Sequence, residues 1–353
     1  MTGRVHLIEV GGRGGVFHHT VGVAEALAAA GTAVVLHTAD DAELTPAGGV
    51  ELCSCMRWRR HLPHRRRQLA VVGEFAGHYT PHVAAALAPG DIAHLQGAFV
   101  PPLLAGLVTA VQIRRRPLVF SPHNTFARYG GRLNTAALRW CARRADATIA
   151  FSLADQHAMA RWGVAATCVD LAHLIPRPAP AQVDAWRQRL GDRPVALLAG
   201  QIRPDKRPEL LVEAVARMGG AVRAAVVGED RGGAAAVRAA AARTGSDVVL
   251  LERYLELSDF VALLTAADVV VCPYQAASVS GPLAMAHVLG VRSVVTDAGG
   301  LSELATATAP PTAEGLASAI AAVLCRPAPA PVPYGAEAAS QHLAVYRAAG
   351  WTG

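Results

Sequence analysis

Short, continuously apolar runs rich in β-branched residues alternate with alanine- and leucine-rich stretches along this chain, and the whole pattern occurs twice. The runs lack the polar–apolar alternation of a half-exposed strand, so each fits a strand that helices cover on both faces. Such strands alternating with helices predict right-handed crossovers and parallel sheets. The expected strands are Arg4–Val10, Ala33–Thr38, Ile92–Leu95, Leu118–Ser121 and Ala147–Ser152 in the first half, and Val195–Ala199, Val222–Val227, Val248–Leu251, Val269–Cys272 and Ser293–Thr296 in the second.

A proline-rich segment, IPRPAPAQ at 175–182, separates the two sets of strands and is typical of a hinge. The length of 353 residues suits two domains of ordinary size. We therefore expect an α/β chain with two doubly wound, Rossmann-like domains, over residues 1–175 and 183–328, facing each other across a central cleft. A last helix is expected around Ala336–Ala349. Ligands of such a fold bind at the carboxyl ends of the strands.

Composition indicates a cytoplasmic protein. Hydrophobic residues make up 52% of the chain and charged residues 17%, yet no apolar run reaches the roughly 18 residues that span a bilayer. The first residues, MTGRVHLIEVGG, do not have the pattern of a signal peptide. The six cysteines are scattered, mostly in apolar segments, as expected for small core residues.

The basic residues are unusual in kind. The net charge is +6, which suits anionic ligands but does not choose among nucleotides, nucleic acids and membranes. Of the 33 basic residues 32 are arginine, and Lys206 is the only lysine. In such an arginine-rich background, a single lysine marks either chance or a place that needs a compact ammonium group.

That lysine lies in the segment GQIRPDKRPELLVEA at 200–214, where a strand ends in a loop and a helix begins near Pro208. Arg203 and Lys206, three residues apart at the carboxyl end of a strand and beside a helix N-terminus, can bind a diphosphate through charge-assisted hydrogen bonds. The alternative is a solvated basic turn.

Two further segments predict anion-binding turns. The first strand ends in GGRGG at 11–15, directly before a helix, so Gly14 and Gly15 allow the backbone to approach a ligand; a plain tight turn is the alternative. In DVVVCPYQAASVSGPLAMAHVLG at 268–290, Ser280 or Gly281 can cap a helix that has Pro282 in its first turn. Neither half contains G-x-G-x-x-G, which disfavours a nicotinamide-dependent oxidoreductase.

These segments, together with VFSPHNTF at 119–126, DIAHLQG at 91–97 and SVVTDAGGLSEL at 293–304, resemble the retaining glycosyltransferases of family 4, which have the GT-B fold. The resemblance implies that Arg203 and Lys206 bind the donor diphosphate and take part in catalysis. It also implies that His123 lies near the transferred sugar and is catalytic. It also implies that the last helix, 335–350, packs back on the N-terminal domain. The donor site that it implies consists of Gly14, Gly15, Arg203, Lys206, Ser280, Gly281, Pro282 and Leu283.

The chain departs from the family in one respect. The family commonly has two glutamates eight residues apart around the Pro282 region, which contact the sugar and the ribose, and here Ala277 and Met285 stand at those places. The expected function is metal-independent sugar transfer, with retention, from a nucleoside-diphosphate donor to an acceptor that the sequence does not identify. The missing carboxylates leave a non-catalytic nucleotide-sugar-binding protein as the alternative.

Three weaker signals remain. Residues Arg57–Arg67 read RWRRHLPHRRR, which fits either peripheral contact with an anionic membrane or a solvated face, whereas one tryptophan is too little for a nucleic-acid module. The pair His18–His19 at the start of the first helix is a candidate acceptor contact or a pair of structural histidines. Cys53, Cys55, His61 and His64 do not have the usual spacing of a zinc site, so we expect neither a metal nor any other cofactor.

Overall fold

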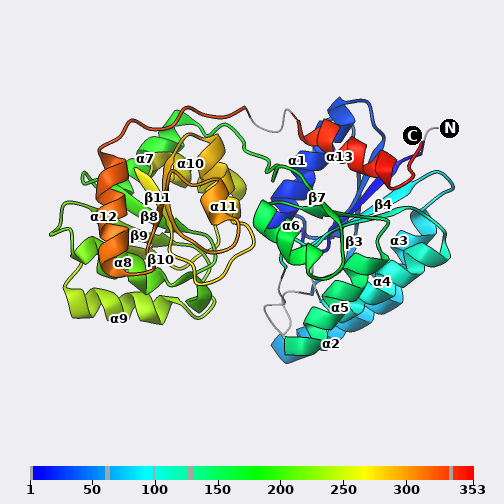
Figure 1. Ribbon diagram of the computed structural model, residues 1–353, viewed down its shortest axis with the longest axis horizontal. Coiled ribbons are helices and arrows are strands. Elements are labelled where there is room, and N and C mark those ends of the chain that lie inside the picture. The colour runs from blue at the N-terminus through cyan, green and yellow to red at the C-terminus, as the bar shows by residue number, and fades with distance from the viewer. Residues whose placement is uncertain (1–2, 60–63, 98–99, 126–130, 334–336) are drawn as a thin grey trace. The chain divides into compact units, whose positions relative to one another are not determined.

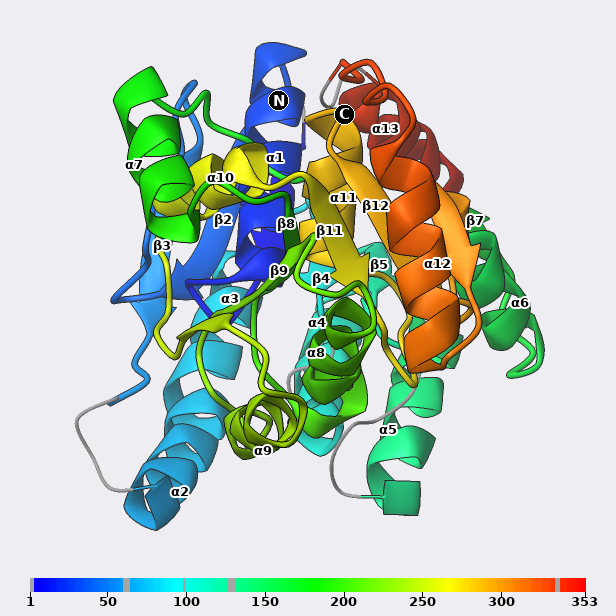
Figure 2. The ribbon, with the colours of Figure 1, turned by 90° about the vertical axis from the view of Figure 1, so that its left-hand side faces the viewer.

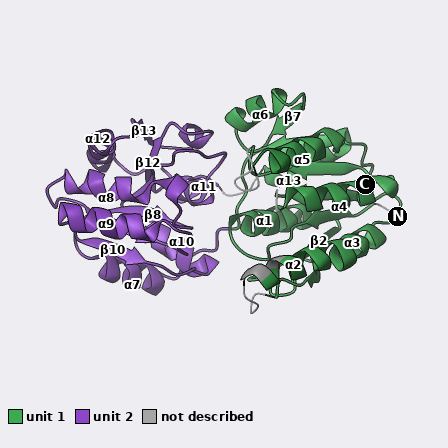
Figure 3. Cartoon of the chain, turned by 90° about the horizontal axis from the view of Figure 1, so that it is seen from below, with its two compact units in different colours: residues 1–174, 335–353 green, residues 175–334 purple. Residues whose placement is uncertain are grey.

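The computed structural model describes residues 3–59, 64–97, 100–125, 131–333 and 337–353. The chain divides into two compact units, which Figure 3 colours separately: unit 1 is residues 1–174 with 335–353, and unit 2 is residues 175–334. In each unit, helices cover both faces of one parallel sheet (Figure 1). The C-terminal segment thus belongs to the same unit as the N-terminus.

Unit 1 is built on a seven-stranded sheet in the order β3-β2-β1-β4-β5-β6-β7. Its strands are β1 (Val5–Ile8), β2 (Val34–Ala39), β3 (Glu51–Met56), β4 (Ile92–Gln96), β5 (Leu118–Ser121), β6 (Ala147–Ala150) and β7 (Ala166–Cys168). Its helices are α1 (Gly15–Ala29), α2 (His64–Glu74), the π-helical turn η1 (Phe75–Tyr79), α3 (Thr80–Ala86), α4 (Pro101–Ile113), α5 (Gly131–Arg144), α6 (Leu153–Ala160) and α13 (Ala338–Ala348).

Two layers of helices cover this sheet. Helix α13 packs beside α1 on one face, and α3, α4 and α5 lie on the other (Figure 1). The second layer encloses the main hydrophobic core of the unit, where Phe75, Tyr79, Leu107 and Phe120 are almost completely buried. Burial on both faces explains why β1, β2, β4 and β5 consist of buried residues throughout.

Unit 2 is built on a six-stranded sheet in the order β10-β9-β8-β11-β12-β13. Its strands are β8 (Val195–Ala199), β9 (Arg223–Val227), β10 (Val248–Leu251), β11 (Val269–Cys272), β12 (Arg292–Thr296) and β13 (Ala307–Ala309). Its helices are α7 (Pro180–Leu190), η2 (Pro204–Lys206), α8 (Pro208–Ala216), α9 (Ala234–Thr244), α10 (Leu257–Ala266), α11 (Gly281–Val288), η3 (Leu301–Glu303) and α12 (Ala313–Leu324). Helices α8, α9 and α12 pack together, as do α7, α10 and α11 (Figures 1 and 2).

In both sheets the order in which successive strands are added reverses at an inner pair of strands, β1 with β4 in unit 1 and β8 with β11 in unit 2. In open parallel sheets such a switch point leaves a crevice at the carboxyl ends of the two strands, because the flanking helices turn to opposite faces there. The GGRGG loop follows β1, and the loop with Lys206 follows β8. The topology therefore places both phosphate-binding candidates at switch points.

The expected α/β class with two Rossmann-like sheets is confirmed, and all ten expected strands are present. Strands β5, β8, β10 and β11 have the expected bounds. The sequence prediction missed β3, β7 and β13. Within the described residues, no helix has both the length and the apolar character needed to cross a bilayer.

Candidate functional site

The loop after β8 brings its glycine, its lysine and the start of α11 together. Gly200 has φ +95°, in the left-handed region that favours glycine. A Cβ at this position would lie 3.4 Å from Lys206 Nζ and 3.4 Å from Pro282 Cγ. The amide of Gln275 also donates to the carbonyl of Asp205 over 2.9 Å. The segments around residues 200–206 and 274–282, expected from the sequence as separate motifs, thus form one site.

Arg203 is held in place before any ligand arrives. Its side chain donates from Nε and Nη2 to the two carboxylate oxygens of Asp205, each over 2.9 Å, and from Nη1 to Gln201 Oε1 over 3.1 Å. The residue is only 7% exposed. The bidentate pair fixes the plane of the guanidinium. Asp205 also neutralises part of its charge, so an incoming anion competes with an internal carboxylate.

Lys206 is as deeply buried as Arg203, at 7% exposure. Its ammonium nitrogen lies 5.0 Å from the centroid of the Tyr274 ring, which is a cation–π distance. Tyr274 follows β11, on the other side of the switch point. Burial raises the pKa of the Tyr274 hydroxyl well above its ordinary value, so the tyrosine stays neutral beside the lysine.

Helix α11 begins at this site with its first amides directed towards the loop. Ser280 caps the helix, and its Oγ accepts a hydrogen bond from the amide of Leu283 over 3.4 Å. Pro282 lies in the first turn, which suits the position because proline has no N–H. The side chain of Leu283 is fully buried, so this residue has a packing role, while Gly281 and Pro282 are partly exposed. The positive end of the α11 dipole therefore adds to the charge of Arg203 and Lys206.

The two positions that differ from the family offer no acid. Met285 is 2% exposed inside α11, and Ala277 lies in the loop before the helix. Gly299, at φ +60°, packs against that loop so tightly that a Cβ would come within 1.8 Å of the Ala277 carbonyl oxygen. The candidate site in unit 2 thus contains two basic side chains, Arg203 and Lys206, and lacks carboxylates at both of these positions.

In unit 1 a buried carboxylate shapes the glycine loop. Glu9, 4% exposed, accepts hydrogen bonds from the amides of Gly11 and Gly12 over 2.6 and 2.9 Å and from Thr38 Oγ1 over 2.9 Å. Burial raises the pKa of Glu9 in spite of these hydrogen bonds. The loop leads to Gly14, which caps α1 at φ +79° without a side-chain hydrogen bond, and a Cβ there would meet open space.

The two adjacent histidines at the start of α1 have different surroundings. His18 is 5% exposed and its Nε2 lies 3.0 Å from Glu43 Oε2. His19 has no exposed surface, and its ring packs edge-on against His123 and Phe151. Gly15 faces the same cluster, since a Cβ there would lie 3.6 Å from His173 Nε2. His18 thus has a polar partner, whereas neither ring nitrogen of His19 has a hydrogen-bond partner among the described residues.

His123 ends the neighbouring strand in an uncommon conformation. It has φ +57°, which is strained for a side chain of this size and fixes the direction of the ring. Its Nε2 lies 2.8 Å from Gln96 Oε1, and the Gln96 amide nitrogen lies 3.3 Å from His94 Nε2. Because the amide oxygen accepts, His123 carries its proton on Nε2, and Nδ1 is then the acceptor. Burial lowers the pKa of His123 to about 3, so the ring is neutral at neutral pH.

The remaining sequence candidates are the arginine-rich segment 57–67 and the group of Cys53, Cys55, His61 and His64. Trp58 donates from its indole nitrogen to the carbonyl of Val10 and packs on the core, so it is not a surface aromatic. Arg57, Arg59 and Arg66 are exposed, while residues 60–63, with His61, and the side chain of His64 lie outside the described residues. Cys53 and Cys55 instead meet two other histidines, His37 and His82.

Sequence reasoning missed several residues that complete these arrangements. Gln96 could have been found, because it lies two positions after His94 on a strand and therefore faces the same side of the sheet. Tyr274 could also have been found, because it lies two residues after the end of the predicted strand Val269–Cys272, where ligand-binding residues are expected. Glu43 and Asp205 carried no recognisable signal, since their roles depend on how loops close in three dimensions.

Comparison with known proteins agrees with this description. A model described as Glycosyltransferase Family 4 matches residues 13–180, and one described as Glycosyl transferases group 1 matches residues 193–326. None of the curated protein sequences matches the chain. Among solved structures, Anabaena HepE in complex with UDP has 19% identity and a TM-score of 0.67, over 91% of this chain and 90% of that one.

Two synthases have similar folds. Sucrose-phosphate synthase of Thermosynechococcus elongatus has 18% identity and a TM-score of 0.71, over 98% of this chain and 96% of that one. A trehalose-6-phosphate synthase of Burkholderia multivorans has 15% identity and a TM-score of 0.67, over 99% and 93%. At these identities the likeness shows the fold.

Proposed function

The chain belongs to the family 4 glycosyltransferases of GT-B fold, and we propose that it transfers a sugar from a nucleoside-diphosphate donor to an acceptor hydroxyl, without a catalytic metal and with retention at the anomeric carbon. The observation that carries this proposal is the convergence of Arg203, Lys206 and the N-terminus of α11 at the switch point of unit 2. The similar fold of HepE, which was solved with UDP, makes a uridine nucleotide the first donor to test.

The chemistry assigned to this site is stabilisation of the leaving group. The bond between the anomeric carbon and the diphosphate oxygen breaks, and its electron pair stays on the diphosphate. Arg203, Lys206 and the α11 amides then face the charge that develops there, in a site already desolvated by burial. The acceptor oxygen bonds to the anomeric carbon, and its proton passes to the leaving phosphate. Two fixed cations supply the positive charge that a divalent metal supplies elsewhere.

In unit 1 we assign His123 to the transferred sugar. The neutral ring, with its proton held on Nε2 by Gln96, presents Nδ1 as a hydrogen-bond acceptor for a sugar hydroxyl. Gly14 and Gly15 allow close approach to the donor phosphates, since a Cβ on Gly14 would meet only open space. His18, paired with Glu43, is the polar group assigned to the acceptor.

The test is release of nucleoside diphosphate from a panel of nucleotide sugars, with mixed sugar and lipid acceptors and without added metal. Wild type should turn over at least one donor, and Lys206→Ala should lower that turnover at least tenfold. Arg187→Ala, which removes an exposed charge from α7, serves as the control. Turnover by Lys206→Ala equal to that of the control would rule out the assigned role of Lys206.

A second function is favoured by one observation. Ala277 and Met285 stand where the family commonly has carboxylates, so the chain has lost the usual sugar and ribose contacts. A non-catalytic nucleotide-sugar-binding protein would retain the phosphate contacts alone. This alternative would be favoured if calorimetry shows tight binding of a nucleotide-sugar donor and that donor releases no nucleoside diphosphate in the presence of any acceptor mixture.

A further inference from the structure

A group of two cysteines and two histidines lies at the edge of the unit 1 sheet, apart from the residues assigned to sugar transfer. Strand β3 is the edge strand and, among the described strands, pairs in parallel only with β2. Cys53 and Cys55 are two residues apart on β3, which is irregular here, because its register with β2 shifts between Thr38 and Ala39. Their sulfur atoms nevertheless lie within 4.8 Å of each other. His37 on β2 is the direct register partner of Cys53. The sheet alone therefore brings three possible ligands together.

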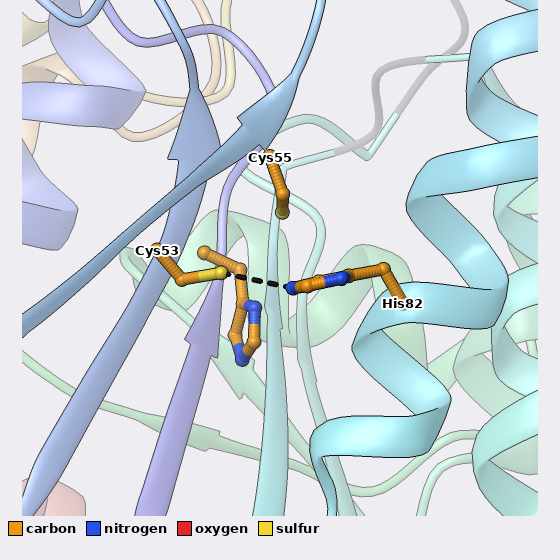
Figure 4. Close-up of side chains that lie close together, drawn as sticks. Cys53, Cys55 and His82 are labelled. Atoms are coloured by element: carbon orange, nitrogen blue, oxygen red, sulfur yellow. Dashed lines mark hydrogen bonds between the residues drawn. The ribbon is translucent and has the colours of Figure 1, made fainter.

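The fourth side chain comes from a helix that packs on this edge. His82 lies in α3, and its Nε2 is 3.1 Å from Cys53 Sγ. Figure 4 shows His82 reaching from its helix towards the two thiols on β3. The ligand atoms of the four residues all lie within 4.8 Å of one another. Helix α3 continues from the π-helical turn η1, an element that is frequent at functional sites.

One ring nitrogen of His37 is available to bind a metal in this group. Its Nε2 lies 2.9 Å from His6 Nδ1, and His6 Nε2 in turn lies 3.0 Å from Asp91 Oδ2. Its other nitrogen, Nδ1, is buried and has no hydrogen-bond partner among the described residues. A buried polar atom without a partner is unfavourable, and in native proteins it usually has an explanation. A metal ligated by Nδ1 would provide one.

The hydrogen bonds from His37 to His6 and from His6 to Asp91 resemble those that orient the ligands of a metal site. Histidines that ligate metals almost always donate through the other ring nitrogen to a carboxylate or another acceptor, which fixes the tautomer and the ring orientation. Here that role falls to His6, which Asp91 orients, and Asp91 is held by the amides of Arg4 and Ala88, each over 2.8 Å.

We propose that His37 Nδ1, Cys53 Sγ, Cys55 Sγ and His82 Nε2 bind one zinc ion. Two thiolates and two imidazoles form a common ligand set of structural zinc sites. Tetrahedral zinc, with bonds of about 2.0–2.3 Å, separates its ligand atoms by about 3.3–3.8 Å, so ligands now within 4.8 Å need shifts of about 1 Å or less. Binding displaces a proton from each thiol that still carries one.

This zinc is structural and takes no part in sugar transfer. Four protein ligands close the tetrahedron and leave no position for substrate. The ion joins β3, which has only one strand neighbour, to α3 on the covering layer. Loss of the ion should therefore loosen the β3 edge and leave the Lys206 site in unit 2 unchanged. The inference stands independently of the proposed function.

The test measures zinc on the full chain. Purified wild type is reduced, stripped with a chelator, incubated with a slight excess of ZnCl₂, passed through gel filtration and analysed for metal by mass spectrometry. We expect about one zinc per chain in wild type, less than about 0.1 in Cys53→Ser/Cys55→Ser, and a full complement in Cys325→Ser, an exposed thiol outside the site. His82→Asn and His78→Asn form a second matched pair, in which only the first should weaken binding.

A cobalt spectrum keeps the test decisive even if a variant folds poorly. Wild type loaded with Co²⁺ should show the strong visible bands of tetrahedral cobalt and a thiolate charge-transfer band, and equimolar zinc should abolish both. Wild type that retains no zinc, or a cobalt complex without thiolate bands, would overturn the proposal. Equal zinc retention by the double serine variant would also overturn it. A disulfide between Cys53 and Cys55 that persists after reduction and prevents loading would count against it as well.

Discussion

Replacing Lys206 with methionine should weaken nucleotide binding while leaving unit 2 folded. Methionine is flexible and apolar, so it can fill the space of the lysine stem without the charge. Removing a hydrogen bond between a charged group and an anion weakens binding by about 1.5–3 kcal/mol. Since about 1.4 kcal/mol corresponds to a factor of ten, the Kd for the nucleoside diphosphate should rise about 10- to 150-fold.

The stability of the unliganded protein should change much less. The substitution removes the contact between Lys206 and the Tyr274 ring, worth about 0.5–2 kcal/mol. It also removes the desolvation penalty of an ammonium group that is only 7% exposed, and this opposes the loss. We therefore expect a net change of about 1 kcal/mol or less. A large loss of affinity with little change in stability separates a binding role from a structural one.

Calorimetric titration of UDP into wild type, Lys206→Met and Arg187→Met measures this prediction directly. Arg187 is an exposed arginine of unit 2 that pairs with Asp184, so its substitution controls for net charge. Lys206→Arg is a useful third variant, because a planar guanidinium does not replace a compact ammonium beside Gly200. A Kd for Lys206→Met within threefold of the wild-type value would refute the reasoning, as would an equal loss in Arg187→Met.

Three further predictions follow from the geometry. Burial lowers the pKa of His123 to about 3, so below pH 6.5 the unfolded chain binds more protons than the folded one. The free energy of unfolding should therefore fall by about 1 kcal/mol between pH 6.5 and 5.5 for each histidine whose pKa burial lowers in this way. Chemical denaturation at the two pH values measures this fall, and equal free energies of unfolding would contradict it. Gly228→Ala would bring a Cβ within 1.9 Å of the Gly200 carbonyl oxygen, so it should destabilise unit 2 by several kcal/mol. Gly232→Ala, where a Cβ at φ +95° would meet open space, should cost much less, and equal thermal midpoints for the two variants would contradict the clash. Replacing exposed Arg57 and Arg59 with serine should reduce co-sedimentation of the protein with anionic vesicles, and unchanged sedimentation would rule out the membrane contact expected of this segment.

The buried strands could be predicted because their physics is local. A strand covered on both faces must be apolar at every position, which is why β8 and β11 were found with their observed bounds. Strand β3 was missed because it is an edge strand whose sequence, ELCSCM, begins with a glutamate and has a serine in the middle of its apolar residues. Strands β7 and β13 are three residues long, too short for any periodic pattern to show.

The group of Cys53, Cys55, His37 and His82 shows why contacts between distant parts of the chain could not be predicted from the sequence. Sequence reasoning looked for ligands close in the chain and considered His61 and His64 beside Cys53 and Cys55. The histidines that meet the two thiols are His37 and His82, which only strand pairing and helix packing bring to them.

The arrangement of the candidate donor site was predictable in part. Arg203 and Lys206 lie close in sequence on one loop, so their shared direction could be inferred from the end of a strand. The pairing of Arg203 with Asp205, and the contact of Lys206 with Tyr274, depend on loop closure and on a second strand. Similarly, nothing in the local pattern at His18–His19 distinguishes the polar histidine from the completely buried one.

The central claim is that unit 2 binds a nucleoside diphosphate through Arg203, Lys206 and the start of α11. Thermal unfolding with UDP, GDP, ADP and dTDP, without added metal, tests it most directly. A ligand at a hundred times its Kd should stabilise the protein by about 2.7 kcal/mol, which is readily visible as a raised midpoint. The account predicts a selective rise with one nucleotide, and at the same ligand concentration the stabilisation in Lys206→Met should fall to about half or less of the wild-type value. No rise with any of the four nucleotides, or an undiminished rise in the variant, would contradict it.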